Sequence, residues 1–226
     1  MENILYRVIC VVVGYVFGLI QTSYIYGKMN HIDIRDYGSG NAGTTNAIRT
    51  LGKKAGLITF LGDIFKAIIC SVLVYFVFKG IVNDRHFLMI LRLYAGVGVI
   101  LGHNFPFYMG FKGGKGVAAS AGVVIGLFDY KIILIELALF IAIVAVTRYV
   151  SLGSLVITAG FFIEFVIFNE LGIYGFHNNM QFTGNQKIET YIIVFFIGAL
   201  AWFKHRTNIV RLLHGTERKL GEKKEV

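Results

Sequence analysis

The sequence predicts an all-α integral membrane protein with about seven transmembrane helices. Hydrophobic residues make up 56% of the 226 residues and charged residues only 15%, a composition far from that of a water-soluble domain. The apolar residues also fall in long runs, and about 20 such residues are enough to cross the hydrocarbon core of a bilayer. The whole chain, residues 1–226, is therefore expected to form a single membrane domain.

Apolar runs predict the spans one by one. They lie near residues 4–27, 55–78, 87–102, 116–128, 132–147, 152–169 and 188–203. The first run is too long, and its basic segment too weak, for a cleaved signal peptide. The fourth and fifth runs are short and close together, so two spans joined by a tight turn and one broken helix are both open, with six or five spans as alternatives.

The distribution of Lys and Arg predicts the orientation. Most of the 22 lie in four stretches, at residues 28–54, 103–116, 147–151 and 204–226. The intervening loops carry only Lys79, Arg85, Lys131 and Lys187. Because loops rich in Lys and Arg face the cytoplasm, the N-terminus is expected outside and the C-terminus inside, as an odd number of spans requires.

The first basic stretch contains a glycine-rich loop followed by the start of a helix. Its candidate phosphate ligands are Ser39, Gly40, Asn41, Gly43, Thr44, Asn46 and Arg49. Backbone amides at a glycine turn or helix start bind anions, and hydroxyl, amide and guanidinium groups add donors. The spacing G-x-G-x-x-G also occurs here, but no strand precedes it, so we reject a dinucleotide site. A plain glycine-rich turn at the membrane surface is the alternative.

The second stretch, residues 102–116, contains a Lys-Gly-Gly-Lys-Gly sequence. Its candidates are His103, Lys112, Gly113, Gly114 and Lys115. Met109 and Gly116 stand where a nucleotide-binding P-loop needs Gly and Ser or Thr, so we reject nucleotide binding. Two ammonium groups and free amides at the start of a span still favour an anion. Anchoring at the cytoplasmic surface by the two lysines is the alternative.

The third stretch directly follows the last span. His205 and Asn208 share one face of a predicted helix and are candidate catalytic groups, although a basic amphipathic helix lying on anionic lipid would look similar. Ser151 and Ser154 begin another span from the same side and are candidate substrate ligands, although helix capping explains a serine there equally well. In the second span, Asp63 and Lys66 have the i, i+3 spacing of an ion pair.

Other features restrict the chemistry. Cys10 and Cys70 lie in apolar runs without metal-ligand spacing, so neither a metal nor a disulfide is predicted. The net charge of +9 suits nucleic acid, anionic lipid or phosphorylated small molecules. The cations beside the glycine loops favour the last two, and no nucleic-acid partner is expected.

Together, the three stretches resemble the PlsY family of bacterial, acyl-phosphate-dependent glycerol-3-phosphate acyltransferases. The resemblance rests on Gly-Ser-Gly-Asn-x-Gly-x-Thr-Asn, Gly-His-x-Phe-Pro with Phe-Lys-Gly-Gly-Lys-Gly-Val-Ala, and His-Arg-x-Asn-Ile-x-Arg-Leu-Leu-x-Gly-x-Glu, and it covers nearly the whole chain. It implies seven helices, three cytoplasmic motif loops, and neither metal nor nucleotide cofactor. Family functional residues then fall on Ser39, Arg49, Lys112, Ser151, His205 and Asn208. Ala67, Ser120 and a longer loop at 170–187 depart from the family pattern.

The resemblance implies an enzyme of the bacterial plasma membrane that acylates glycerol 3-phosphate from an acyl phosphate. Such a donor is already activated, so no covalent intermediate is needed, and no G-x-S-x-G nucleophile motif occurs. His205, His103 or a substrate phosphate oxygen is a candidate for the base. A multispan carrier of organic phosphate is the alternative, but its polar groups should line the bilayer midplane. Acyl-chain preference, regulation and oligomeric state are left open by the sequence.

Overall fold

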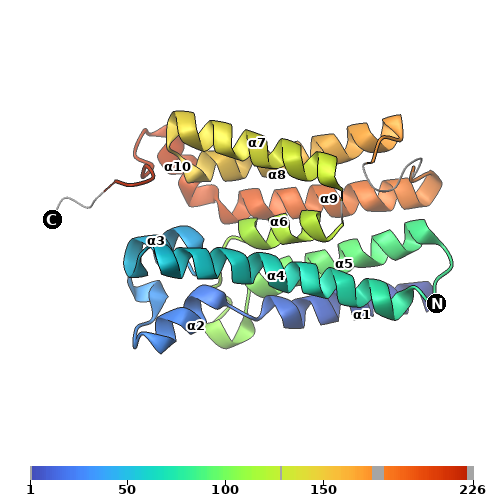
Figure 1. Cartoon of the computed structure of the whole chain (residues 1–226), viewed down its shortest axis with the longest axis horizontal. Helices are drawn as coiled ribbons and strands as arrows, with labels where there is room; N and C mark the ends of the chain where they lie inside the picture. The colour runs from blue at the N-terminus through green and yellow to red at the C-terminus, as the bar shows by residue number, and fades with distance from the viewer. Residues whose placement is uncertain (1, 128, 175–180, 223–226) are drawn as a thin grey trace.

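The computed structural model describes residues 2–127, 129–174 and 181–222, and within them all regular structure is helical. The helices are α1 (Glu2–Gly18), α2 (Thr22–Met29), α3 (Thr44–Leu51), α4 (Lys53–Phe78), α5 (Arg85–Asn104), α6 (Val117–Gly126), α7 (Tyr130–Thr147), α8 (Val150–Leu171), α9 (Gly184–Lys204) and α10 (Arg206–Leu213). Two short 3₁₀ helices, η1 (Ile34–Asp36) and η2 (Phe107–Met109), lie in the loops before α3 and α6. The helices form an elongated bundle (Figure 1).

Six segments of the described chain are long and apolar enough to cross a membrane. They are Ile4–Met29, Lys53–Phe78, Arg85–Met109, Tyr130–Thr147, Val150–Leu171 and Gly184–Lys204. The all-α membrane prediction is therefore confirmed. The predicted span at 116–128 corresponds to α6, whose 10 residues are too few to cross a bilayer alone at about 1.5 Å per residue.

The first predicted span is not one continuous helix. It breaks between Gly18, where α1 ends, and Thr22, where α2 begins. The carbonyl of Ile20 accepts a hydrogen bond from Lys66 Nζ at 2.6 Å, and Gln21 Nε2 donates to the carbonyl of His103 at 2.9 Å. The break is possible because the protein supplies polar partners that the bilayer does not. Hydropathy along the sequence does not reveal such distant partners, so the break could not be predicted from it.

The short helix α6 ends inside the bundle. At its C-terminus the carbonyl of Gly126 accepts hydrogen bonds from the guanidinium of Arg92 and from Ser71 Oγ, the latter at 3.2 Å. The last carbonyls of a helix lack partners within the helix itself. Side chains of α4 and α5 thus stabilise a helix end that lipid would leave unsatisfied.

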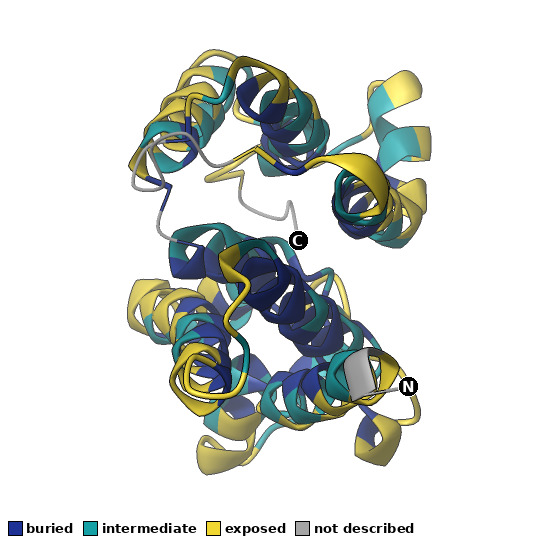
Figure 2. Cartoon of the chain, turned by 90° about the vertical axis from the view of Figure 1, so that its right-hand side faces the viewer, coloured by how far each residue is buried: buried dark blue, intermediate teal, exposed yellow. Residues whose placement is uncertain are grey.

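Helix α5 forms the centre of the bundle. In the most apolar part of the segment Arg85–Met109, 78% of the residues are buried inside the protein, against 6% in α7 at the periphery. Figure 2 shows exposed residues mainly on the outer helices. Close contact with α1 depends on glycine, since a Cβ atom at Gly98 would lie 2.2 Å from the carbonyl oxygen of Val11, and one at Gly14 would lie 2.1 Å from that of Ala95. Small residues allow such approach between membrane helices.

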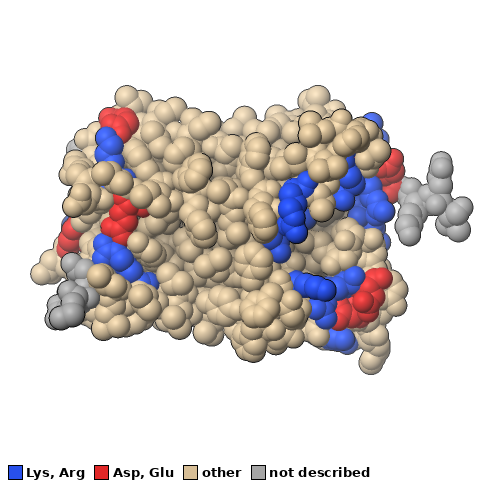
Figure 3. All heavy atoms as spheres, turned by 180° about the vertical axis from the view of Figure 1, so that it is seen from behind, with Lys and Arg blue, Asp and Glu red and all other residues tan. Residues whose placement is uncertain are grey.

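The long axis separates two unlike ends. Helix α1 begins at the right of Figure 1, whereas α3, α10 and the turn between α7 and α8 lie at the left. Seen from behind, Lys and Arg gather mainly at the end that carries α3 and α10, and a broad belt without exposed charges separates the two ends (Figure 3). The three motif stretches therefore lie on the same side of the apolar belt.

Candidate active site

Asn46 holds the first glycine loop in shape. Its Nδ2 donates to the carbonyls of Ile34 and Tyr37 at 3.0 and 3.1 Å, and its Oδ1 accepts the backbone N–H of Ser39 at 2.8 Å. Gly38 has φ +65°, and a Cβ atom there would meet Asn46 Oδ1 at 2.2 Å. Asn46, expected to bind phosphate, is buried and its amide is used within the protein.

The loop presents other groups outward. Gly40 (φ +70°) and Ser39 are exposed and Asn41 is half-buried, whereas the buried Gly43 and the half-buried Thr44 form the start of α3. One turn further on, Arg49 is exposed and has no ion pair to a carboxylate in the described chain. Partial burial and the neighbouring charge of Arg218 lower the pKa of Arg49. Arg49 and the start of α3 therefore offer a positive charge and free backbone N–H groups to an anion.

The second loop packs directly onto the first. The backbone N–H of Gly114 donates to the carbonyl of His103 at 3.1 Å. A Cβ atom at Gly114 would lie 2.1 Å from His103 Nε2 and 2.6 Å from the carbonyl oxygen of Ala42 in the first loop. Arg35 also donates to the carbonyl of Met109 at 2.9 Å. Glycine at position 114 is therefore what lets the two loops meet.

The two lysines of the second loop differ in environment. Lys115 is half-buried, and its ammonium donates to Oδ1 of Asn208 in α10. Burial lowers the pKa of Lys115 to about 8, although the nearby Glu217 opposes the shift. Lys112 and its neighbour Gly113 lie further out, with Lys112 exposed. Lys115 thus joins the second and third motifs, and Lys112 remains accessible from solvent.

Glu217 organises the third motif and was not among the predicted site residues. Its carboxylate accepts hydrogen bonds from Ser151 Oγ at 2.9 Å, Asn208 Nδ2 at 2.7 Å and Arg211 Nε at 2.7 Å. In the sequence it is the only acidic residue between 204 and 219, which is the signal that could have identified it. By contrast, Ser154 Oγ donates to the carbonyl of Val150 within α8.

His205 lies at the junction of α9 and α10 and is buried. Its Nδ1 lies 2.8 Å from the carbonyl oxygen of Ala201, and since a carbonyl only accepts, Nδ1 carries the proton. Burial, with the nearby charge of Lys115, lowers the pKa of His205 to about 4. At neutral pH the ring is therefore uncharged and Nε2 has a free lone pair, as a general base requires.

His103 and Asn104 lie beneath the second loop at the end of α5. Both are buried, and His103 Nδ1 lies 2.9 Å from Lys66 Nζ. Neither polar atom of the Asn104 side chain has a hydrogen-bond partner in the described chain. A Cβ atom at Gly116 would lie 2.8 Å from Asn104 Oδ1, so this amide faces the start of α6. Asn104 was not predicted from the sequence, which gives no signal for an unpaired amide.

The assembled groups favour binding of anions. Arg49, Lys112 and Lys115 supply positive charge, and the glycine loops and the starts of α3 and α6 supply backbone N–H groups. Among the described residues, no group of three or more His, Cys, Asp or Glu side chains is arranged to hold a metal ion. The site can therefore hold phosphate groups by hydrogen bonds and charge.

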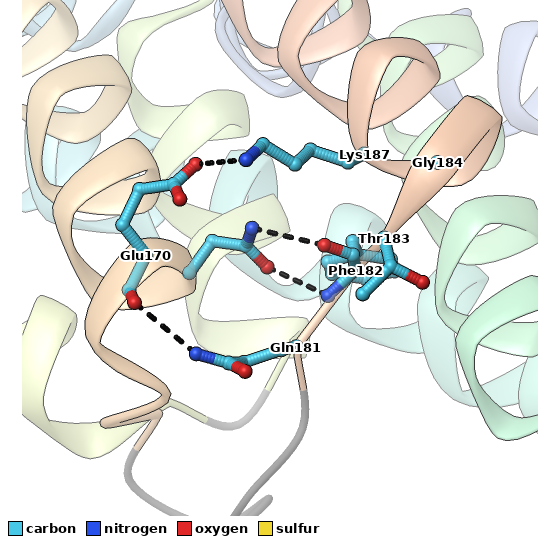
Figure 4. Close-up of a pocket in the computed structure, with 7 residues that line it drawn as sticks. Glu170, Gln181, Phe182, Thr183, Gly184 and Lys187 are labelled. Carbon is cyan, nitrogen blue, oxygen red and sulfur yellow. Dashed lines mark hydrogen bonds and ion pairs between the residues drawn. The ribbon is translucent and has the colours of Figure 1, made fainter.

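A separate cavity, whose lining residues are drawn in Figure 4, lies at the end of the bundle opposite α3 and α10 (Figure 1). It has a volume of about 300 Å³ and lies between the end of α8 and the start of α9. Its charged side chains and Asn169 are already paired, with Lys187 Nζ 2.6 Å from Glu170 Oε1 and the Asn169 side chain bonded to the backbone of Phe182. This cavity shares no residue with the three motifs.

Comparison with known proteins identifies relatives along the whole chain. Residues 8–215 match the family model described as glycerol-3-phosphate acyltransferase. The glycerol-3-phosphate acyltransferase of Clostridioides difficile (strain 630) is 41% identical over 220 residues, which are 96% of this chain and 97% of that protein. The protein of the same name from Thermoanaerobacter sp. (strain X514) is 39% identical over 223 residues, covering 98% and 100% of the two chains.

Two solved structures have the same fold. The crystal structure of PlsY (YgiH), an integral membrane glycerol 3-phosphate acyltransferase, in its glycerol 3-phosphate form superposes with a TM-score of 0.76 at 32% sequence identity and covers 95% of this chain and 96% of that one. Its lysophosphatidic acid form gives a TM-score of 0.73 at the same identity, covering 95% of each chain.

Proposed function

The chain belongs to the glycerol-3-phosphate acyltransferase family that includes PlsY, and we propose that it moves an acyl group from an acyl phosphate to the 1-hydroxyl of glycerol 3-phosphate. A new ester bond forms, the acyl–phosphate bond breaks, and lysophosphatidic acid and inorganic phosphate leave. The observation that carries the proposal is the meeting of three distant motifs around Gly114, Lys115 and Glu217.

The two substrates each carry a phosphate, and the site has two groups of donors. Ser39, Arg49 and the amides of the first loop hold one phosphate in this proposal, and Lys112 and Lys115 with their glycines hold the other. Lys115 and Arg49 are both close to the third motif, since each is influenced by the charge of Glu217. Holding both substrates in one orientation, in a site rich in hydrogen-bond donors, would supply most of the rate.

The transfer itself needs a proton acceptor for the glycerol hydroxyl. His205 Nε2 has the required lone pair at neutral pH, because Nδ1 donates to Ala201 and the pKa is lowered to about 4. A base of such low pKa removes a proton only as the bond to carbon forms. A phosphate oxygen of the substrate is the other acceptor within this mechanism.

A groove beside the first motif suits the acyl chain. The space between α3 and α4 has a volume of about 240 Å³, and Ile48, Leu57 and Phe60 supply most of its apolar lining. Thr44 and Lys53 line the same groove. An apolar groove with a cation and a hydroxyl beside it matches a lipid chain that ends in a phosphate.

The topology supports a cytoplasmic site in the bacterial plasma membrane. In this proposal, the short helix α6 together with a neighbouring loop serves as a fourth pass, and with the six full-length segments the chain makes seven passes. Helix α1 begins at the end opposite α10 (Figure 1). The end rich in Lys and Arg faces the cytoplasm by the positive-inside rule, so the N-terminus is outside and the C-terminus inside. One membrane domain then carries the whole activity, with glycerol 3-phosphate arriving from the cytosol and the acyl phosphate from the bilayer.

The same purified protein distinguishes an enzyme from a carrier of organic phosphate. Proteoliposomes are given labelled glycerol 3-phosphate outside, with and without palmitoyl phosphate in the bilayer. The proposal predicts labelled lysophosphatidic acid only with the donor and no label in the lumen without it. Uptake without acyl transfer would establish the carrier. Replacing palmitoyl phosphate by a palmitoyl thioester should give no product, and equal rates would reject the acyl-phosphate donor.

A further inference from the structure

Lys66 has three close hydrogen-bond acceptors around its ammonium deep in the second span, and the carbonyl oxygen of Gly18 lies further away, at 3.5 Å. Asp63 Oδ1 lies 2.9 Å from Nζ, the carbonyl oxygen of Ile20 2.6 Å and His103 Nδ1 2.9 Å. The side chains of Lys66 and Asp63 are each 2% exposed. An ammonium has three protons and no acceptor, so the three close contacts can take one proton each.

The charge on Lys66 follows from its neighbour. Besides Lys66, the carboxylate of Asp63 has a weaker hydrogen bond from Thr22 Oγ1 at 3.3 Å, and His103 Nδ1 lies 3.6 Å away. A neutral Lys66 would leave this buried carboxylate without a cation, which is far less favourable than a hydrogen-bonded pair. Because the charged ammonium only donates, His103 Nδ1 must accept, and the proton of the neutral ring lies on Nε2.

Nε2 of His103 lies where the two glycine loops meet. A Cβ atom at Gly114 would lie 2.1 Å from it and 2.6 Å from the carbonyl oxygen of Ala42. The ring therefore reaches from the buried Asp63–Lys66 pair up to the backbone of the second loop. Its N–H adds one more hydrogen-bond donor, from the buried side of the second loop, to the backbone amides and ammonium groups of the site.

We propose that Lys66, held by Asp63, fixes His103 as an Nε2–H donor to a phosphate bound between the two glycine loops. His103 is then excluded as the general base, since its only lone pair is occupied by Lys66. His205 has the opposite arrangement, with Nδ1 donating and Nε2 free. Lys66 and Asp63 are positioning residues that act through His103. The inference rests on the proposed function for the identity of the phosphate, whereas the position of the proton stands independently.

Nitrogen NMR of the wild-type protein tests the position of the proton without any activity. The protein is labelled with ¹⁵N-histidine in detergent micelles, and the His103 signals are identified by their loss in His103→Gln. The proposal predicts a protonated Nε2 and an unprotonated Nδ1 near neutral pH. A proton on Nδ1 would overturn it, and this result would say nothing against acyl transfer by the protein.

Kinetics of matched variants tests the donor role. The amide of Gln places an N–H close to the Nε2 position, whereas Ala provides none. We expect His103→Ala to raise KM for a phosphate substrate by about 10- to 100-fold, the effect of a lost hydrogen bond to a charged group, and His103→Gln to recover most of that loss with an unchanged shape of the pH–rate profile. Equal losses in the two variants would contradict a donor.

A neutral replacement of the ion pair tests Lys66. The double variant Asp63→Asn/Lys66→Met leaves no unpaired buried charge, and thermal unfolding in detergent confirms that it is folded. We expect both ring tautomers of His103 in its ¹⁵N spectrum and a KM raised by about tenfold, with kcat changed less. A folded double variant with the wild-type His103 signals and wild-type KM would overturn the positioning role.

Discussion

Ser151 Oγ lies 2.9 Å from Oε1 of Glu217, although 66 positions separate the two residues in the chain. The same carboxylate oxygen accepts a hydrogen bond from Nδ2 of Asn208, and Oδ1 of Asn208 accepts one from the ammonium of Lys115. The start of α8, the third motif and the second loop are therefore joined by one chain of hydrogen bonds. Ser154, one turn later, donates within its own helix and is outside this chain.

Substitution of the two serines should separate their roles. We expect Ser151→Ala to lower kcat/KM by about tenfold, because a hydrogen bond to a charged group is lost at the site. Ser154→Ala should lower it by less, since the lost bond is to the carbonyl of Val150. Initial rates of both variants under identical conditions measure the two decreases in kcat/KM. A larger decrease in Ser154→Ala than in Ser151→Ala would contradict this prediction.

Arg49 is predicted to bind a substrate phosphate. Arg49→Ala should lower kcat/KM for glycerol 3-phosphate by about 100-fold, since a charge-assisted bond to a phosphate is removed. Lys79→Ala removes the same charge from an exposed site at the other end of the protein and serves as the control. A kcat/KM of Arg49→Ala within a few-fold of the control would contradict the assignment.

The pH dependence should report Lys115. Its pKa is lowered to about 8 by burial, so it loses its charge, and with it the attraction for phosphate, as the pH rises through that value. We expect kcat/KM to fall on the alkaline side near pH 8 and Lys115→Arg to move this fall to higher pH, because a guanidinium does not titrate there.

Two comparisons strengthen the pH experiment. Lys112→Arg should leave the alkaline fall where it is in the wild type. His205, whose pKa is lowered to about 4, is uncharged throughout the neutral range and should add no change of its own between pH 6 and 8. An alkaline fall at the same pH in wild type and Lys115→Arg would show that another group titrates.

The close glycine contact between α1 and α5 should contribute to the stability of the folded protein. A Cβ atom at Gly98 would lie 2.2 Å from the carbonyl oxygen of Val11, whereas one at Gly80 would meet no atom within 4 Å. We expect Gly98→Ala to lower the free energy of unfolding by about 1–3 kcal/mol through overpacking, with Gly80→Ala much closer to wild type. Thermal unfolding in detergent measures both, and equal melting temperatures would contradict the close packing.

The full-length spans could be predicted from the sequence because apolar length is a local property. The run at 55–78 became α4 (Lys53–Phe78), and that at 87–102 became α5 (Arg85–Asn104). The break after Gly18 and the early end of α6 at Gly126 were not predictable in the same way. Each depends on a distant side chain, Lys66 in one case and Arg92 in the other.

For the site, sequence patterns indicated the loops but not the use of each side chain. The glycine spacing at 38–43 and 113–116 indicated phosphate binding, and the structure brings those loops into contact. Asn46 was expected to face substrate, yet its amide holds the loop. Glu217 stands out in the sequence as the only acidic residue between 204 and 219. Its organising role depends on three donors from α8 and α10, which only the fold brings together.

The central claim is direct acyl transfer at one site assembled from three loops. The most direct test is to mix the purified protein with palmitoyl phosphate and glycerol 3-phosphate and to measure lysophosphatidic acid and inorganic phosphate together. The account predicts equal amounts of the two products from the first turnover, and little phosphate without glycerol 3-phosphate. A burst of phosphate before lysophosphatidic acid appears, or the absence of lysophosphatidic acid, would contradict it.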